Sequence, residues 1–383
     1  MIYMDNSATS YPKPYSVISE TQKGLSEYFA NPGRGASRDA VRSSGMLYAS
    51  RDAVASLVGT SPESIVFTYN ATYALNMAIH GTVRQGMTVA YDKFAHNSVL
   101  RPIYALSKNG VNAVALDTHP TRDSVLISAF EQLASEGKVD VLVLTHTSNV
   151  TGKQLPIKRM SNICRRYGVL LIVDASQGLG CCDINMADMG IDILASSGHK
   201  GLYGIMGTGF LAVREGLKLE ITPLITGGSG IFSKQREMPE ELPERLEAGT
   251  VGLPGIISMK AGAEYIAKVG AEAIGDRERY LRGILVEGLS SIKGIKVYNA
   301  DVNARSIVLF NIKGMSVSQA GEMLDREGIV LRSGFHCSPL AHSMLCDSED
   351  YNGALRLSVG YFNTVSQCKK VLKAVNSIAT VIS

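Results

Sequence analysis

The sequence predicts an α/β protein, with a mostly parallel sheet in a large domain and a smaller α+β domain toward the C-terminus. Two observations lead to this class. Between about residues 60 and 215, short β-rich apolar runs alternate with helical patterns. From about residue 255 the pattern changes to long helices, followed by strands and further helices. A chain of 383 residues also exceeds one typical domain of roughly 100–200 residues.

The elements follow one another in a regular order. In the large domain we expect strands at 65–68, 89–91, 111–116, 139–145 and 169–173, and helices at 71–80, 97–107, 124–136 and 157–167. A glycine-rich and charged stretch at 227–247 interrupts the rhythm and predicts an exposed excursion. In the small domain we expect helices at 256–268, 271–289, 317–327 and from 365, and strands at 295–298, 306–311, 329–332 and 355–359. The predicted large domain spans 15–255, and the small domain combines 1–14 with 256–383.

Composition excludes several classes of protein. Hydrophobic residues make up 45% of the chain and charged residues 19%, as in a globular protein with a large core. The net charge of +3 is too small to favour nucleic acid or an anionic membrane surface. The apolar runs are strand-sized, far short of the roughly 20 residues of a membrane span. The N-terminus lacks a signal-peptide pattern, and the six cysteines lack disulfide or zinc spacing, so we expect a cytoplasmic protein with reduced thiols and no metal site.

A lysine and an aspartate carry the strongest chemical signal. Lys200 ends the turn Ser-Ser-Gly-His-Lys, and Asp174 ends the apolar run that starts at Val169. A pyridoxal phosphate enzyme needs a lysine that forms a Schiff base with the cofactor aldehyde. It also needs a carboxylate that keeps the pyridine nitrogen protonated, so that the ring can act as an electron sink. The alternative for Lys200 is a surface lysine after a glycine turn.

Other polar residues follow predicted strands, where ligands of such sheets bind. Ala71 and Thr72 open a helix, and together with Ser197 and His199 they predict a phosphate site. The alternative is a simple helix cap. The remaining residues of this kind are His96, a candidate to stack on the pyridine ring, and Asn149 and Gln177, candidates to contact the ring oxygen or merely to form turns.

Cys337 is the candidate nucleophile. It lies in a polar loop after a strand, and the neighbouring Arg332 and His336 favour its thiolate form. The alternative is a small buried hydrophobe, which suits Cys164 and Cys368 in their helices. Arg356 lies in an apolar strand, where its planar fork suits the carboxylate of an amino-acid substrate; the alternative is an internal salt bridge.

These residues together resemble the class V aminotransferase family of fold-type I pyridoxal phosphate enzymes, and within it the cysteine desulfurase and selenocysteine lyase group. The resemblance runs nearly end to end. The strand-end aspartate with the Ser-Gly-His-Lys turn is specific for the family, and the R-x-G-x-H-C motif is specific for one desulfurase subgroup. The matching segments are 3–9, 70–72, 95–97, 148–152, 173–177, 197–200, 247–250, 332–337 and Arg356.

The resemblance implies a role for each site residue. Cys337 would attack the sulfur of L-cysteine, leaving alanine and a cysteine persulfide, while Lys200 moves the protons. Asp174 would pair with the pyridinium, and His96 would stack on the ring. The other implied cofactor contacts are Asn149, Gln177, Ala71, Thr72, Ser197 and His199, with Thr250 reaching the phosphate of a neighbouring subunit; Arg356, Asn6, Ala8 and Arg34 would serve the substrate.

The resemblance also implies a homodimer and a sulfur-acceptor protein, and it admits L-selenocysteine as a substrate. Two alternatives remain, a pyridoxal phosphate lyase or aminotransferase of the same fold and a non-catalytic binding module that uses its thiols. One departure stands out, because Ser37 occupies a position where relatives of the subgroup tend to carry histidine in an Arg-Gly-x-His context.

Overall fold

The computed structural model describes residues 1–33, 35–217, 221–345 and 353–382. Its centre is a seven-stranded sheet of order β2-β8-β7-β6-β5-β3-β4, in which β8 runs against its neighbours and the other strands run parallel to one another. The strands are β2 (Ile65–Thr68), β3 (Thr88–Asp92), β4 (Asn112–Leu116), β5 (Val141–Thr145), β6 (Leu170–Asp174), β7 (Ile193–Ser197) and β8 (Gly209–Val213). This confirms the predicted fold class.

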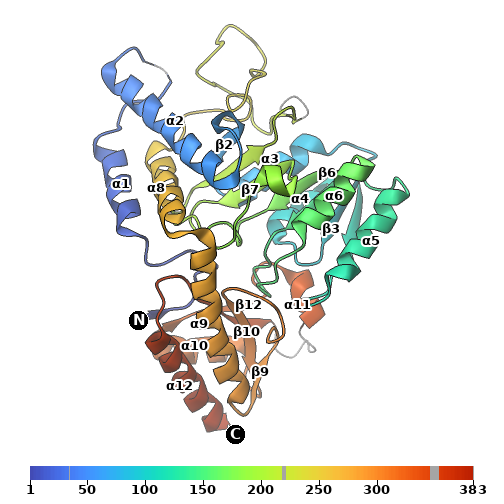
Figure 1. Cartoon of the computed structure of the whole chain (residues 1–383), viewed down its shortest axis with the longest axis vertical. Helices are drawn as coiled ribbons and strands as arrows, with labels where there is room; N and C mark the ends of the chain where they lie inside the picture. The colour runs from blue at the N-terminus through green and yellow to red at the C-terminus, as the bar shows by residue number, and fades with distance from the viewer. Residues whose placement is uncertain (34, 218–220, 346–352, 383) are drawn as a thin grey trace.

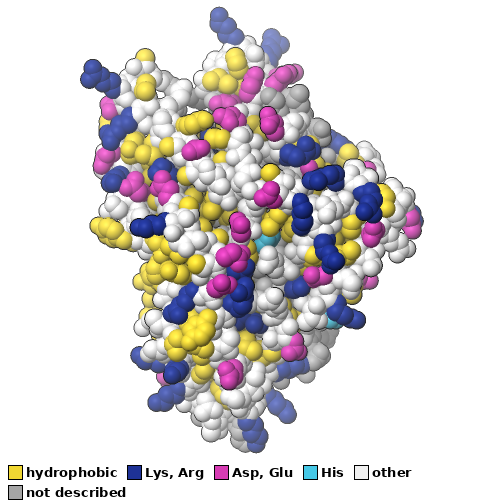
Figure 2. Space-filling model, in the orientation of Figure 1, with side chains coloured by type: hydrophobic (Ala, Val, Ile, Leu, Met, Phe, Trp, Pro, Cys, Tyr) yellow, Lys and Arg dark blue, Asp and Glu magenta, His cyan; other side chains and the backbone are white. Residues whose placement is uncertain are grey.

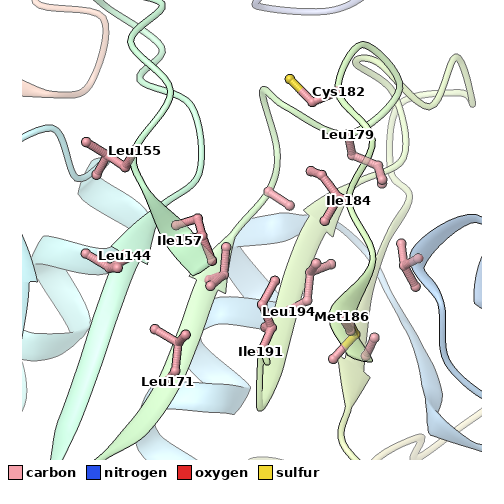
Figure 3. Close-up of a cluster of buried hydrophobic side chains, with 14 of the residues drawn as sticks. Leu144, Leu155, Ile157, Leu171, Leu179, Cys182, Ile184, Met186, Ile191 and Leu194 are labelled. Carbon is pink, nitrogen blue, oxygen red and sulfur yellow. The ribbon is translucent and has the colours of Figure 1, made fainter. Parts of the chain in front are cut away.

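Helices cover both faces of this sheet because its strands are apolar on both sides (Figure 1). Leu142 and Leu144 of β5 face one core, and the alternate residues Val141 and Val143 face the other. Figure 3 shows part of the first core, where side chains of β5, β6 and β7 meet those of the following segments. The helices are α1 (Tyr15–Ser26), α2 (Arg38–Val58), the 3₁₀ helix η1 (Pro62–Ser64), α3 (Ala71–Thr82), α4 (Asn97–Ser107), α5 (Asp123–Ser135), α6 (Ile157–Tyr167) and α7 (Met186–Met189).

A second layer holds the C-terminal part of the chain, at the bottom of Figure 1. Its antiparallel sheet has the order β12-β13-β10-β9 and packs against α9, α10 and α12 in a separate core. Met4 belongs to the same core, so the N-terminal strand returns to this layer. The remaining elements of the chain are β1 (Ile2–Tyr3), α8 (Leu253–Val269), which lies beside α2 (Figure 1), α9 (Ala271–Ser291), β9 (Ile295–Val297), β10 (Ile307–Ile312), α10 (Val317–Arg326), β11 (Ile329–Val330), β12 (Arg332–Gly334), α11 (Pro339–Leu345), β13 (Ala354–Ser358) and α12 (Val365–Ile382).

Most predicted elements are present, and the differences have physical reasons. Helices 97–107 and 157–167 are confirmed to the residue. The strand predicted at 329–332 is two strands, because β11 pairs with β1 whereas β12 pairs with β13. The helices α1 and α2 and the strands β7 and β8 are absent from the prediction. Since α8 packs on both α1 and α2 and joins directly to α9, the domain division at residue 255 stays a prediction.

The excursion predicted at 227–247 contains neither helix nor strand among its residues, and it projects as a long loop at the top of Figure 1. Much of it is exposed to solvent. None of the helices in the described part of the chain combines the length and the hydropathy that crossing a bilayer requires.

Candidate active site

A cavity lies where the carboxyl ends of β5, β6 and β7 meet the first turns of α3 and α4. This is the edge at which parallel sheets bind ligands, because the loops there diverge and leave a crevice. Its lining residues are Asn70, Ala71, Thr72, His96, Ser98, Thr145, Thr147, Asn149, Asp174, Ser176, Gln177, Ser197, His199 and Lys200. All the residues predicted to contact the cofactor within one chain are therefore brought together, Thr250 being the one assigned to a neighbouring subunit.

Asp174 is the last residue of β6, Lys200 follows the end of β7, and both line the cavity. The carboxylate oxygen Oδ1 of Asp174 accepts hydrogen bonds from the backbone N–H and the hydroxyl of Ser176, at 3.0 and 2.5 Å. Burial, opposed by the Asp174 carboxylate and supported by the positive Arg356 and Arg332, lowers the pKa of Lys200 to about 8. The neutral, nucleophilic amine is therefore a minority form near neutral pH, but far more abundant than for an ordinary lysine.

His96 is the N-cap of α4. Its Nδ1 accepts the backbone N–H of Ser98 at 3.0 Å and lies 2.7 Å from the Ser98 hydroxyl, which is 2.8 Å from Thr72 Oγ1. Burial lowers the pKa of His96 to about 4, so the ring is neutral at physiological pH. Since Nδ1 accepts the hydrogen bond from the Ser98 N–H, the ring proton of this neutral form is on Nε2. Ser98 was not predicted, and only the i, i+2 spacing of a histidine cap could have indicated it.

The cavity offers unused polar groups to an anion. Among the described residues, Ser197 Oγ and His199 Nδ1 are buried without a hydrogen-bond partner. The first turn of α3, at Ala71 and Thr72, adds backbone N–H groups that have no acceptor within the helix. Buried orphan donors of this kind are costly unless a ligand satisfies them. Together with Asp174 for a protonated ring nitrogen and Lys200 for an aldehyde, this residue set fits pyridoxal phosphate.

The N-terminal segment is fastened to the turn that carries Lys200. The carbonyl oxygen of His199 accepts hydrogen bonds from Thr9 Oγ1 at 3.1 Å, Ser10 Oγ at 3.2 Å and Lys13 Nζ at 2.8 Å. Burial lowers the pKa of Lys13 to about 8. Lys13 was not predicted, because its contact is 186 residues away in the sequence and no local pattern marks it.

Two predicted amide ligands already have partners inside the protein. Asn149 Nδ2 donates to the carbonyl oxygen of His336 at 2.7 Å, and Asn149 Oδ1 accepts the Ser338 hydroxyl at 2.7 Å. Gln177 Nε2 donates to the carbonyl oxygen of Ser7 at 2.9 Å. Both side chains line the cavity. These hydrogen bonds tie the loop after Gly334 and the N-terminal segment to the sheet.

Cys337 lies in the loop between β12 and α11 and is partly exposed. Its sulfur is 3.8 Å from Arg332 Nη2, so a positive charge stands beside the thiol as predicted. His336 behaves differently from the prediction. Its ring is buried and lies next to His342 and the Arg332 carbonyl, and burial lowers its pKa to about 2. The imidazole is neutral, so Arg332 alone supplies the local charge within this motif.

The predicted substrate residues are in part engaged elsewhere. Arg356 is 2% exposed, and its Nη2 forms an ion pair with Asp5 at 2.7 Å, which is the internal salt bridge that the sequence left open. Its Nη1 donates to the carbonyl oxygen of Asn149, whereas Nε has no partner among the described residues. Asn6 bonds to Ser358, Asn363 and Tyr11.

The remaining predicted residues lie outside the cavity or outside the described part of the chain. Ala8 closes a turn onto the carbonyl oxygen of Asp5. Thr250 is exposed and lines a separate pocket with Tyr69 and Glu247. Arg34 is not among the described residues, and Ser37 caps α2 by accepting the Ala40 N–H at 3.2 Å. Within the described ranges, no group of three or more His, Cys, Asp or Glu side chains is placed to hold a metal ion.

Comparison with known proteins agrees with the geometry. The chain is 31% identical over 382 residues to a probable cysteine desulfurase of Methanothermobacter thermautotrophicus, an alignment that covers 99% of this chain and 94% of the relative. Its structure is similar to a cysteine desulfurase of Thermococcus onnurineus, with a TM-score of 0.90, 28% identity and coverage of 99% and 95%.

The structure of the cysteine desulfurase CsdA of Escherichia coli is also similar, with a TM-score of 0.86, 25% identity and coverage of 100% of this chain and 95% of the other. The family model for class V aminotransferases matches residues 2–371. That match spans the central sheet, the cavity and the loop of Cys337. The chain therefore belongs to the class V aminotransferase family, whose cofactor is pyridoxal phosphate.

Proposed function

We propose that this chain is a cysteine desulfurase, which uses pyridoxal phosphate to convert L-cysteine to L-alanine and leaves a persulfide on Cys337. One observation carries the proposal. The loop that holds the Cys337 thiol beside the Arg332 guanidinium is bonded to the rim of the cavity that Lys200 lines: the Cys337 carbonyl accepts the Asn97 N–H, next to His96, and the His336 carbonyl accepts Asn149 Nδ2. Relatives that are similar over nearly the whole chain bear the name of this activity, which supports the assignment.

The cofactor's contribution is an electron sink that makes the substrate's α- and β-carbon bonds reactive. Its phosphate would be held by Ser197, His199, Thr72 and the first turn of α3. Asp174 would keep the ring nitrogen protonated, and the neutral His96 would lie against the ring. The Ser176 hydrogen bonds fix the Asp174 carboxylate in place, so its charge is preorganised.

Lys200 would hold and move protons between the substrate carbons. An amine with a pKa of about 8 can take a proton from one carbon and return it to another near neutral pH, because both of its forms are populated. The Cys337 thiolate would attack the substrate sulfur. An S–S bond forms as the Cβ–S bond breaks, the electron pair goes to carbon, and a proton from Lys200 completes the methyl group of alanine.

The substrate carboxylate would be bound by Arg356. Support comes from its unpartnered Nε and from its electrostatic interaction with both Lys200 and Cys337. Asp5 would share the guanidinium, since their ion pair occupies only Nη2. Asn6, Ala8 and Arg34 belong to the proposed substrate side, where Asn6 lines a smaller neighbouring cavity with Lys200 and Gln177.

The assembly belongs to the proposal as well. Exposed hydrophobic side chains at α1, among them Tyr15 at 83% and Leu25 at 68% exposure, favour a homodimer, and Figure 2 shows hydrophobic side chains gathering on that side. Thr250 would then reach the partner's phosphate site.

The proposal also includes a cytoplasmic location, a sulfur-acceptor protein and L-selenocysteine as a second substrate. L-selenocysteine is favoured as a substrate because selenium leaves more easily than sulfur.

The lowered pKa of Lys200 predicts how cofactor attachment depends on pH. Only the neutral amine forms the covalent bond, so the rate of attachment to the cofactor-free protein should rise with pH up to about 8 and then level off. An ordinary lysine would show a rise that continues to about pH 10.4. Rapid-mixing absorbance measurements would follow the reaction, and a rate that still climbs between about pH 8.5 and 10 would contradict the prediction.

The proposed reaction is tested by its products. Purified, cofactor-loaded protein is incubated with L-cysteine and a thiol reductant, and alanine, sulfide, pyruvate and ammonia are quantified. We expect alanine and sulfide in equal amounts, since the reductant releases the persulfide sulfur. Formation of pyruvate and ammonia instead would identify a β-eliminating lyase and would contradict the desulfurase assignment. Protein reduced with borohydride before the incubation is the control, because its lysine can no longer release the cofactor.

A further inference from the structure

The loop that carries Cys337 has an unfavourable backbone conformation. His336 and Cys337 are consecutive non-glycine residues with φ of 51° and 59°, in the left-handed region. Side chains with a Cβ adopt this region rarely, and two in succession are rarer still. The conformation therefore depends on contacts that the loop makes with the rest of the protein.

The main chain of the loop is anchored on two sides. The carbonyl oxygen of His336 accepts Asn149 Nδ2 at 2.7 Å, and that of Cys337 accepts the Asn97 N–H at 2.8 Å. These bonds join the loop to the segment after β5 and to the start of α4, next to His96. They fix the positions of the two carbonyls and leave the rotation of the His336 side chain to other contacts.

His342 supplies that contact from α11. The ring atoms His336 Nδ1 and His342 Nε2 are 2.9 Å apart, and both side chains are buried, at 4% and 2% exposure. His336 Nε2 lies 3.4 Å from the carbonyl oxygen of Arg332, which can only accept a hydrogen bond. His336 therefore carries its proton on Nε2, its Nδ1 accepts, and His342 Nε2 donates.

This arrangement is stable across physiological pH. Burial lowers the pKa of His336 to about 2 and that of His342 to about 4, with Arg356 adding to both shifts. Both rings stay neutral, so the direction of each hydrogen bond is fixed. The chain of contacts runs from α11 through His342 and His336 to the carbonyl of Arg332, whose guanidinium stands beside the Cys337 sulfur.

We propose that His342 is a positioning residue of the reaction: by donating to His336 Nδ1 it holds the loop in the conformation that presents Cys337 to the substrate sulfur. The inference rests on the proposed function, in which Cys337 is the nucleophile. The proposal gives α11 a role in catalysis as well as in packing. This helix starts two residues after Cys337 and places His342 against His336 of the loop.

The test compares three variants at this position. His342→Ala and His342→Asn remove the donor or place it out of reach, and should lower kcat for L-cysteine about 10- to 100-fold with little change in KM, because the nucleophile is misplaced. His342→Gln keeps an amide N–H close to the position of Nε2 and should recover most of kcat. Ser343→Ala, exposed on the same helix, is the matched control with unchanged kinetics.

A second readout does not depend on turnover. Alkylation of Cys337 by iodoacetamide, followed by peptide mass spectrometry, should be faster in His342→Ala than in the wild-type protein and in His342→Gln. Unchanged kcat and alkylation in a folded His342→Ala variant would overturn the proposal, as would a glutamine variant as impaired as the alanine variant. If Cys337→Ala retains turnover, the proposed function fails instead, while the alkylation rates still report on the loop.

Discussion

Replacing Cys337 by alanine is expected to lower the release of sulfide from L-cysteine by at least about 100-fold, the lower end of what a positioned catalytic group contributes. The reason is chemical. Without the thiolate, the proposed acceptor of the substrate sulfur is gone, so the Cβ–S bond has no route to a persulfide. Since Cys337 does not line the cofactor cavity, the absorbance of the bound cofactor should be unchanged. The measurement pairs a sulfide assay with an absorption spectrum.

The control for this experiment is another cysteine of the same chain. Burial raises the pKa of Cys368 to about 11, so its thiolate is scarce at neutral pH, and it is packed in the core of the C-terminal layer. Cys368→Ala should therefore keep full turnover per folded molecule. A Cys337→Ala variant with unchanged alanine production would show that this thiol is incidental, and the lyase or aminotransferase alternative would replace the desulfurase.

The cofactor cavity could be predicted from sequence because its residues obey a topological rule. Asp174, Ser197 and Thr72 are far apart in the chain, but each follows a strand of one parallel sheet, and the carboxyl ends of such strands converge. The period of the apolar runs indicated β2 and β6, whereas β7, which ends at Ser197, was not predicted, and Ser197 was chosen for its place beside the Gly-His-Lys turn. Asp174 and Ser197 are the last residues of β6 and β7, and Thr72 lies in the first turn of the helix that follows β2.

The loop of Cys337 could not be predicted in the same way. The sequence predicts Asn149 as a cofactor contact at the edge of the cavity. Its amide also donates a hydrogen bond to the backbone carbonyl of His336, 187 residues away, which no local pattern indicates. The sequence predicts His336 as a positive charge beside the thiol, but burial lowers the pKa of its imidazole and keeps it neutral. Burial depends on the packing of the folded chain and not on the neighbours in the sequence. The positive φ angles of this loop also have no sequence signal, because neither residue is glycine.

Replacing Lys200 by alanine is expected to lower turnover of L-cysteine by roughly 1000-fold or more, because one residue both binds the cofactor covalently and moves protons. Covalent attachment should disappear as well. After borohydride treatment and denaturation, the wild-type protein should retain the cofactor on the peptide containing Lys200, and the variant should retain none. Lys200→Arg keeps the positive charge and should be as inactive, since an arginine is neither a neutral nucleophile nor a base at this pH.

Lys13 makes this test discriminating. Burial lowers its pKa to about 8, the same value as for Lys200, so a lowered pKa cannot by itself identify the cofactor lysine. Geometry separates the two, because Lys13 is bonded to Ser10 and the carbonyl oxygen of His199 and does not line the cavity that holds Asp174. Lys13→Ala should therefore still fix the cofactor at Lys200. Borohydride labelling of Lys13 in the wild-type protein would mean that the N-terminal segment, and not the turn after β7, carries the reactive amine.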